Sequence, residues 1–190
     1  MFISVSDIFK IGVGPSSSHT MGPMTGASLF LKSLTNSGFQ PHKLRATLHG
    51  SLAYTGKGHA TDRAVILGLA GYVPDNIDSS RIDEIINQIT NDKIVSPEGF
   101  SPMRFDPSID LVFDYGPPLP GHANGMRFFA YNEGGDEICC QTYYSIGGGF
   151  VVLEEELVKR DAEDNEQVSE NIPYPFSTSS EMLRLGKERN

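Results

Sequence analysis

Small hydroxyl side chains stand beside an imidazole near the start of the chain, where the sequence reads GPSSSHTMGP. The polar residues between the two Gly-Pro pairs are Ser16, Ser17, Ser18, His19 and Thr20. Hydroxyls, free backbone N–H groups and the positive end of a helix all favour an anion, so the stretch fits an oxyanion or carboxylate site. It fits equally a polar turn whose hydroxyls satisfy the N–H groups of a following helix. It is not a P-loop, because the Gly-Lys-Ser/Thr sequence is missing.

A glycine-rich loop further along the chain carries another imidazole. In the stretch HGSLAYTGKGHATD, Lys57 and His59 alternate with Gly56 and Gly58, whose backbone freedom lets both side chains turn to one point. A histidine in such a loop titrates near neutral pH and can act as an acid or a base. A surface turn without chemistry explains the same residues. His49, at the start of this stretch, lies on the polar side of a predicted strand, which makes it a structural or surface residue.

A third stretch, PPLPGHANGMRF, places His122 and Asn124 just before a predicted strand. Asn-Gly is a turn signal, so a simple turn is one interpretation. However, His19, His59 and His122 all lie in glycine-containing loops rather than on apolar faces. Because functional sites gather in loops held by a scaffold, we expect the three histidines to converge on one face of the fold, together with the serine hydroxyls.

Hydrophobic periodicity predicts the elements that position these loops. Four helices are predicted. Thr20 is expected to cap the first, Thr61 or Asp62 to open the second, Ser79 or Ser80 to open the third, and Ser179 or Ser180 to cap the last. The predicted strands cover residues 44–48, 109–113, 126–131, 137–144 and 150–153, with a hairpin turn at 132–135. The acidic, Pro- and Ser-containing stretch 154–180 is predicted to be a linker. This order predicts an α+β fold, with helices packed on an antiparallel or mixed sheet.

The composition limits what the chain can bind. Its 190 residues fit one domain with a short tail, and the formal net charge is −9. This charge argues against nucleic acid and anionic membrane surfaces as partners, because both require a basic face. The sequence has no signal peptide and no apolar run long enough to cross a bilayer, so we expect a cytoplasmic protein. The cysteines, Cys139 and Cys140, are adjacent, and we expect reduced packing residues rather than metal ligands.

The three loop stretches together resemble a known family. GPSSSHTMGPM, GSLAYTGKGHATDRAVILGL and GHANGMRF are similar to the β domain of the bacterial iron–sulfur L-serine dehydratases, also called L-serine deaminases or L-serine ammonia-lyases. The resemblance covers essentially the whole chain. It implies a β domain over residues 1–155, followed over 156–190 by a linker that leads to a missing α domain. It also implies an α+β fold like that of the allosteric substrate-binding domain of D-3-phosphoglycerate dehydrogenases.

The resemblance also implies a reaction and its partners. The complete enzyme would convert L-serine into pyruvate and ammonia, with a 4Fe–4S cluster held by cysteines of the α domain and without pyridoxal phosphate. This chain, as a fragment or a separate subunit, would bind no metal and would be inactive alone. It would pack on the α domain of the same enzyme, which is expected to be a homodimer.

Roles for single residues follow from the same resemblance. His59 is the expected catalytic base, and His122 and His19 complete the catalytic group. The hydroxyl groups expected to face the cluster or the substrate carboxylate are those of Ser16, Ser17, Ser18 and Thr20. Lys57 and Asn124 would support substrate binding. The alternative function is a regulatory domain that senses serine and performs no chemistry.

Overall fold

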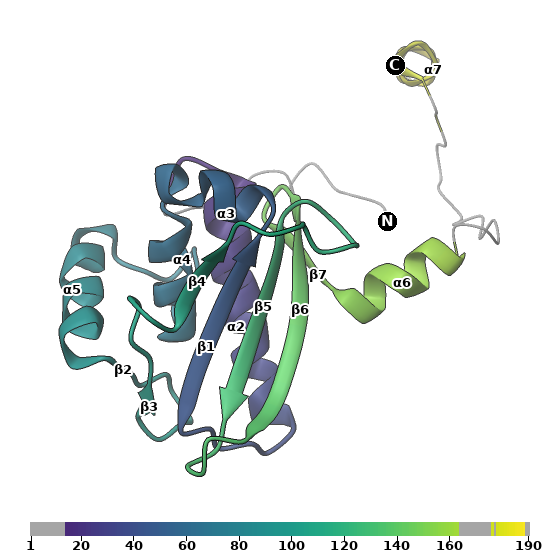
Figure 1. Cartoon of the computed structure of the whole chain (residues 1–190). Coiled ribbons are helices and arrows are strands. Elements are labelled where there is room, and N and C mark those ends of the chain that lie inside the picture. Colours follow the sequence, from purple (N-terminus) through teal and green to yellow (C-terminus); the bar gives the residue numbers. More distant parts are fainter. Residues whose placement is uncertain (1–13, 164–175, 177, 189–190) are drawn as a thin grey trace. The chain divides into compact units, whose positions relative to one another are not determined.

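The structure, a computed structural model, describes residues 14–163, 176 and 178–188. The chain divides into two compact units, Met1–Leu157 and Val158–Asn190 (Figure 1). The larger unit contains the sheet and the three histidine loops. The smaller unit contains α7 (Ser179–Lys187), which begins with a capping box between Thr178 and Glu181. The predicted terminal helix is present, but Thr178 caps it rather than the expected Ser179 or Ser180.

Seven strands of the described residues form one mixed sheet in the larger unit. Their bounds are β1 (Lys43–His49), β2 (Ile94–Val95), β3 (Met103–Arg104), β4 (Leu111–Asp114), β5 (Gly125–Tyr131), β6 (Glu137–Gly147) and β7 (Phe150–Leu153). The order is β2–β3–β1–β5–β6–β7, and β4 also pairs with β1. β1 runs parallel to β3 and β4 and antiparallel to β5, so the two parts of the sheet meet on this strand.

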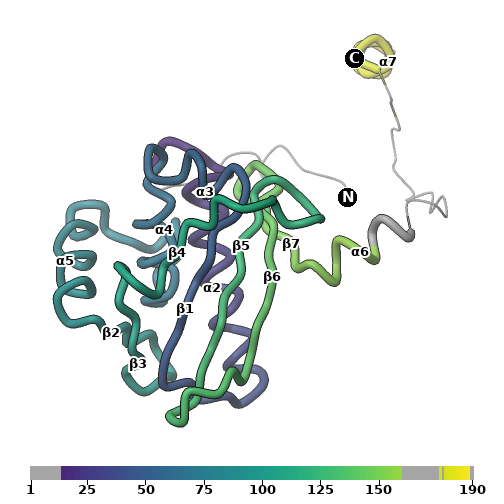
Figure 2. Tube along the Cα trace, in the orientation of Figure 1, coloured from purple at the N-terminus to yellow at the C-terminus, as the bar shows by residue number. Residues whose placement is uncertain are grey.

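Helices connect these strands and cover the core. Their bounds are η1 (Ser17–Met21), α2 (Gly22–Asn36), α3 (Ser51–Thr55), η2 (Gly56–His59), α4 (Thr61–Leu69), η3 (Ser79–Arg81), α5 (Ile82–Asp92) and α6 (Glu154–Glu163). α2 packs against β5, β6 and β7, behind the sheet in Figure 2, and α4 packs on α2. Phe30 of α2 stacks on Phe128 of β5, with 5.5 Å between the ring centroids. The predicted class, α+β with helices packed on a mixed sheet, is confirmed.

Most of the elements read from periodicity are present. β1, β4, β5, β6 and β7 lie at the predicted strands, with ends that differ by a few residues. The predicted hairpin turn is also present, because the N–H of Asn132 donates to the carbonyl of Asp136 and Gly135 has a φ of +87°. α4 begins at Thr61, as expected.

The prediction that Thr20 caps a helix is wrong. Residues Ser17–Met21 form a π-helical turn, and the side chain of Ser16 caps it by accepting a hydrogen bond from the N–H of His19. α2 begins only at Gly22, with Pro23 in its first turn, where a missing N–H costs nothing. The hydroxyl of Thr20 makes a different contact, to the loop around His59.

Three further predictions need correction. The predicted linker at 154–180 begins with a helix, α6, and residues 164–175 of that stretch lie outside the described residues. The third helix is opened by a 3-10 turn, which Asp78 rather than a serine caps. The TGKGH stretch is not an irregular loop, because α3 and η2 continue through it. None of the helices in the described ranges is long and apolar enough to cross a membrane.

The close crossing of α2 and α4 depends on Gly68. A Cβ at this position would lie 2.6 Å from the carbonyl oxygen of Met24 and 2.7 Å from the Cβ of Ala27. We expect Gly68→Ala to lower the free energy of unfolding by about 1–3 kcal/mol, because the helices must move apart. Urea unfolding measures the change. Gly58→Ala is the control, since nothing lies within 4 Å of its added Cβ. Equal urea midpoints for the two variants would contradict this packing.

Candidate active site

His19 is held by hydroxyl groups on both sides of its ring. Nδ1 lies 2.9 Å from the Oγ of Ser18, and Nε2 lies 2.9 Å from the Oγ of Ser51. Ser18 belongs to the same π-helical turn, whereas Ser51 begins α3 directly after β1. A hydroxyl can donate or accept, so a neutral imidazole is satisfied here in either tautomer.

The surroundings of His19 favour its neutral form. Burial lowers the pKa of the imidazole below its ordinary value, and the neighbouring His59 lowers it further. An interaction with the backbone of Ser51 acts in the opposite direction but is smaller. His19 is therefore uncharged at neutral pH.

His59 lies beside His19 but is bonded differently. The two ring centroids are 5.0 Å apart, and the ring planes are tilted by 42°. Nδ1 of His59 lies 2.9 Å from the carbonyl oxygen of Thr55. A carbonyl only accepts hydrogen bonds, so Nδ1 holds the proton of the neutral ring and Nε2 keeps its lone pair. Within the described part of the chain Nε2 has no hydrogen-bond partner, and the ring is partly exposed.

Two threonine hydroxyls bind the segments of these histidines to each other. Thr20 Oγ1 donates to the carbonyl of His59 at 2.9 Å, and Thr61 Oγ1 donates to the carbonyl of His19 at 2.6 Å. Both threonines are buried. We call this pair of hydrogen bonds the threonine clamp. It fixes both histidine backbones, and therefore the distance between the rings.

The other polar residues of the first two histidine segments differ in whether their side chains are free to meet a substrate. Ser17 and Lys57 are exposed, and the ammonium of Lys57 lies 5.5 Å from the centroid of the Phe113 ring. Ser16 is used as the cap of η1. His49, in contrast, is buried and bonded to the hydroxyl of Thr47, so it is a structural residue.

The third loop lies against the site through its backbone. The N–H of Ser51 donates to the carbonyl of Ala123 at 2.8 Å, which places the residue after His122 next to the Ser51–His19 contact. Asn124 is buried, and its side-chain amide donates to the carbonyl of Ser145 in β6. Nδ1 of His122 accepts from the N–H of Asn124. The structure therefore brings His19 and His59 into direct contact, and His122 near them only through Ala123.

Ser51 is a site residue that sequence reasoning missed. The signal that points to it is local: a glycine and a serine follow a strand directly and open a helix. Gly50 has a φ of +55°, and a Cβ there would lie 2.3 Å from the carbonyl of Ala123. A glycine is required for the chain to turn Ser51 toward His19 at this point.

The described residues were compared with the ligand sets that metal ions require. Among the described residues, no group of three or more His, Cys, Asp or Glu side chains is placed to hold a metal ion. Cys139 and Cys140 are neighbours in β6, so their side chains point to opposite faces of the sheet. Burial raises the pKa of both thiols, which disfavours the thiolate that a metal requires. The described residues do not fit an iron–sulfur cluster.

Removing either half of the threonine clamp should destabilise the fold. Thr61→Val and Thr20→Val each leave a histidine carbonyl without its buried donor, and we expect a loss of about 1–3 kcal/mol in the free energy of unfolding. Urea unfolding measures both losses. Thr90→Val is the matched control, because its hydroxyl bonds Ile86 on the exposed side of α5 and should matter little. Clamp variants as stable as this control would refute the arrangement.

The imidazole of His19 should titrate below the ordinary value of 6.5, because burial and His59 both disfavour its charge. An NMR titration measures the midpoint, and His59→Asn should raise it by removing the like-charged neighbour. Since the folded protein holds this proton more weakly than the unfolded chain, the contribution to stability is present above about pH 6.5 and is lost as the pH falls. A midpoint at or above 6.5 would contradict this environment.

Comparison with known proteins identifies the family. The family model described as serine dehydratase beta chain matches residues 4–156. The chain is 41% identical over 191 residues to the L-serine dehydratase of Streptomyces coelicolor. That alignment covers 99% of this chain and 41% of the relative. It is 42% identical over 190 residues to L-serine dehydratase 1 of Escherichia coli K12. That alignment covers 98% of this chain and 40% of the relative. The chain thus spans about two fifths of the length of these relatives. It belongs to the serine dehydratase beta chain family.

Proposed function

We propose that this chain supplies part of the active site of an L-serine dehydratase, an ammonia-lyase that converts L-serine into pyruvate and ammonia. The observation on which this rests is the pair of unlike imidazoles. His19 has both ring nitrogens bonded, whereas Nε2 of His59 has no partner among the residues that the structure describes. The relatives named L-serine dehydratase align with nearly the whole of this chain, which supports the same substrate.

His59 acts as the base that removes the α-proton of L-serine. The carbonyl of Thr55 keeps the ring proton on Nδ1, so the lone pair of Nε2 accepts the substrate proton. The imidazolium that forms still donates Nδ1–H to that carbonyl, so the ring keeps its position when it gains the proton. Since His19 stays neutral, it adds no second positive charge next to this group.

The rest of the reaction follows from loss of this proton. The electron pair left on Cα forms the Cα–Cβ double bond as the β-hydroxyl leaves as hydroxide. The aminoacrylate product tautomerises to an imine, and water hydrolyses the imine to pyruvate and ammonia. The substrate carboxylate needs a cation and hydroxyl donors, and the exposed groups beside the histidines that meet this need are Lys57 and Ser17.

The complete active site requires more protein than this chain. The described residues do not fit an iron–sulfur cluster, and the relatives extend well beyond the region they share with this chain. We infer that the cluster is held by cysteines of the α domain in that remaining part. Packing of this chain on that domain, in a cytoplasmic homodimer, is part of the same proposal.

Substitution of His59 in the complete enzyme tests the assignment. We expect His59→Ala to lower kcat by about 10²–10⁴-fold, the usual contribution of a positioned acid–base group. KM should stay nearly unchanged, because the interaction is made mainly in the transition state. Steady-state kinetics on L-serine measure both, and added imidazole should restore part of kcat by replacing the missing base.

His49→Gln is the control for this experiment. His49 is 6% exposed and bonded to Thr47, so its loss should lower stability but leave kcat per folded enzyme unchanged. A folded His59→Ala enzyme with a near-normal kcat would remove His59 as the base. If the same variant still bound L-serine to this chain, the regulatory, serine-sensing alternative would be favoured instead.

A further inference from the structure

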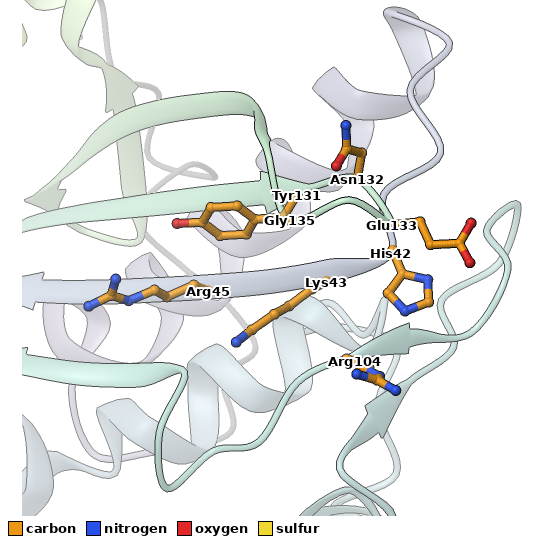
Figure 3. A pocket seen from close by; sticks show the side chains of 8 residues that line it. All are labelled: His42, Lys43, Arg45, Arg104, Tyr131, Asn132, Glu133 and Gly135. Carbon is orange, nitrogen blue, oxygen red and sulfur yellow. The ribbon is translucent and has the colours of Figure 1, made fainter.

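A hollow lies at the beginning of β1, at the other end of the strand from His19 and His59. Its volume is about 310 Å³, within the size range of small-molecule sites. Its polar lining, shown in Figure 3, includes His42, Lys43, Arg45, Arg104, Tyr131 and Glu133. The seven residues of β1 separate it from Ser51 by about 20 Å, given the rise of a strand. The hollow is therefore not part of the candidate active site.

The hollow is basic in a protein that is strongly acidic overall. Lys43, Arg45 and Arg104 line it, whereas the formal net charge of the chain is −9. Lys43 is partly neutralised, because its ammonium lies 2.7 Å from the buried carboxylate of Asp110. Within the described ranges, neither Arg45 nor Arg104 has an acidic side chain within ion-pair distance. Among the described residues, these two guanidinium groups thus have no counter-charge.

Strand pairing places two of these cations side by side on adjacent strands. Lys43 is paired with Arg104 of β3 on one side and with Tyr131 of β5 on the other. Arg45 follows two residues later and projects on the same face as Lys43, as Figure 3 shows. Its guanidinium lies 6.0 Å from the centroid of the Phe129 ring, and this cation–π contact orients it along the sheet. The backbone and one aromatic ring therefore preorganise the positive charges.

We propose that this hollow binds the phosphate or carboxylate group of a small anionic metabolite, as a site separate from that of the substrate. A guanidinium presents two parallel N–H groups that match the oxygens of either group. The ammonium of Lys43 and the partly buried phenol of Tyr131 supply further donors beside them. Glu133, the acid in the lining, is exposed and limits the affinity by repelling the ligand.

Titration with simple anions tests the proposal on the 190-residue chain. Inorganic phosphate and succinate are added at constant ionic strength, and ¹H–¹⁵N shifts of β1, β3 and β5 report binding. We expect saturable shifts with at least one anion, and competition between the two if both bind. Phosphate alone would assign a phosphorylated ligand, and succinate alone a dicarboxylate.

Variants expected to change the Kd in opposite directions distinguish binding in the hollow from general attraction of anions to positive charge. Arg104→Gln and Arg45→Gln should each raise the Kd about tenfold, since each removes a charge-assisted pair. Glu133→Gln should lower it. Arg81→Gln is the control, because Arg81 is an exposed arginine outside the hollow and should leave the Kd unchanged. Shifts that do not saturate, or an Arg81→Gln effect equal to that of Arg104→Gln, would overturn the proposal.

Discussion

The arrangement of the candidate site depends on the two hydrogen bonds of the threonine clamp. Thr20 follows His19 directly, and Thr61 follows His59 by two residues. Each threonine binds the backbone of the other histidine, so two segments far apart in sequence are joined twice. Both threonines are buried, and a buried carbonyl without a donor costs more than the bond contributes when made. Close packing around the threonines needs small neighbours: a Cβ on Gly14 would lie 2.5 Å from Cγ2 of Thr20. Gly14 thus allows the clamp to close.

The clamp makes two identical side chains chemically different. Both histidine backbones are fixed, so the partner of each ring nitrogen is decided by what the nearby backbone and hydroxyls offer. His19 meets hydroxyls at both nitrogens and loses affinity for a proton through burial. His59 meets a carbonyl at Nδ1, which selects one tautomer and leaves Nε2 available. A single histidine could not be both a fixed neutral neighbour and a free base.

Elements whose periodicity reflects burial could be predicted from the sequence. Contacts that depend on hydrogen bonds between distant segments could not. Alternation over Leu44–Leu48 and the hairpin turn at 132–135 specify β1, β5 and β6, because one face of each strand is buried. Thr20 was expected to cap a helix, since threonine caps are common. Its hydroxyl has a tertiary partner instead, the His59 carbonyl, and no local pattern indicates it. Ser51 was missed for the same reason, and so was the clamp that brings two of the three histidines together.

The partial exposure of His59 is the physical reason for our proposal that this unit needs further protein to form a complete catalyst. A base removes a weakly acidic α-proton efficiently only where water is excluded and the developing charge is stabilised by fixed groups. In the larger unit the ring of His59 is only partly buried and Lys57 is exposed. The clamp positions the base, but it does not cover the base against water. In the proposed enzyme the covering groups come from protein beyond this chain, which agrees with relatives that are more than twice its length.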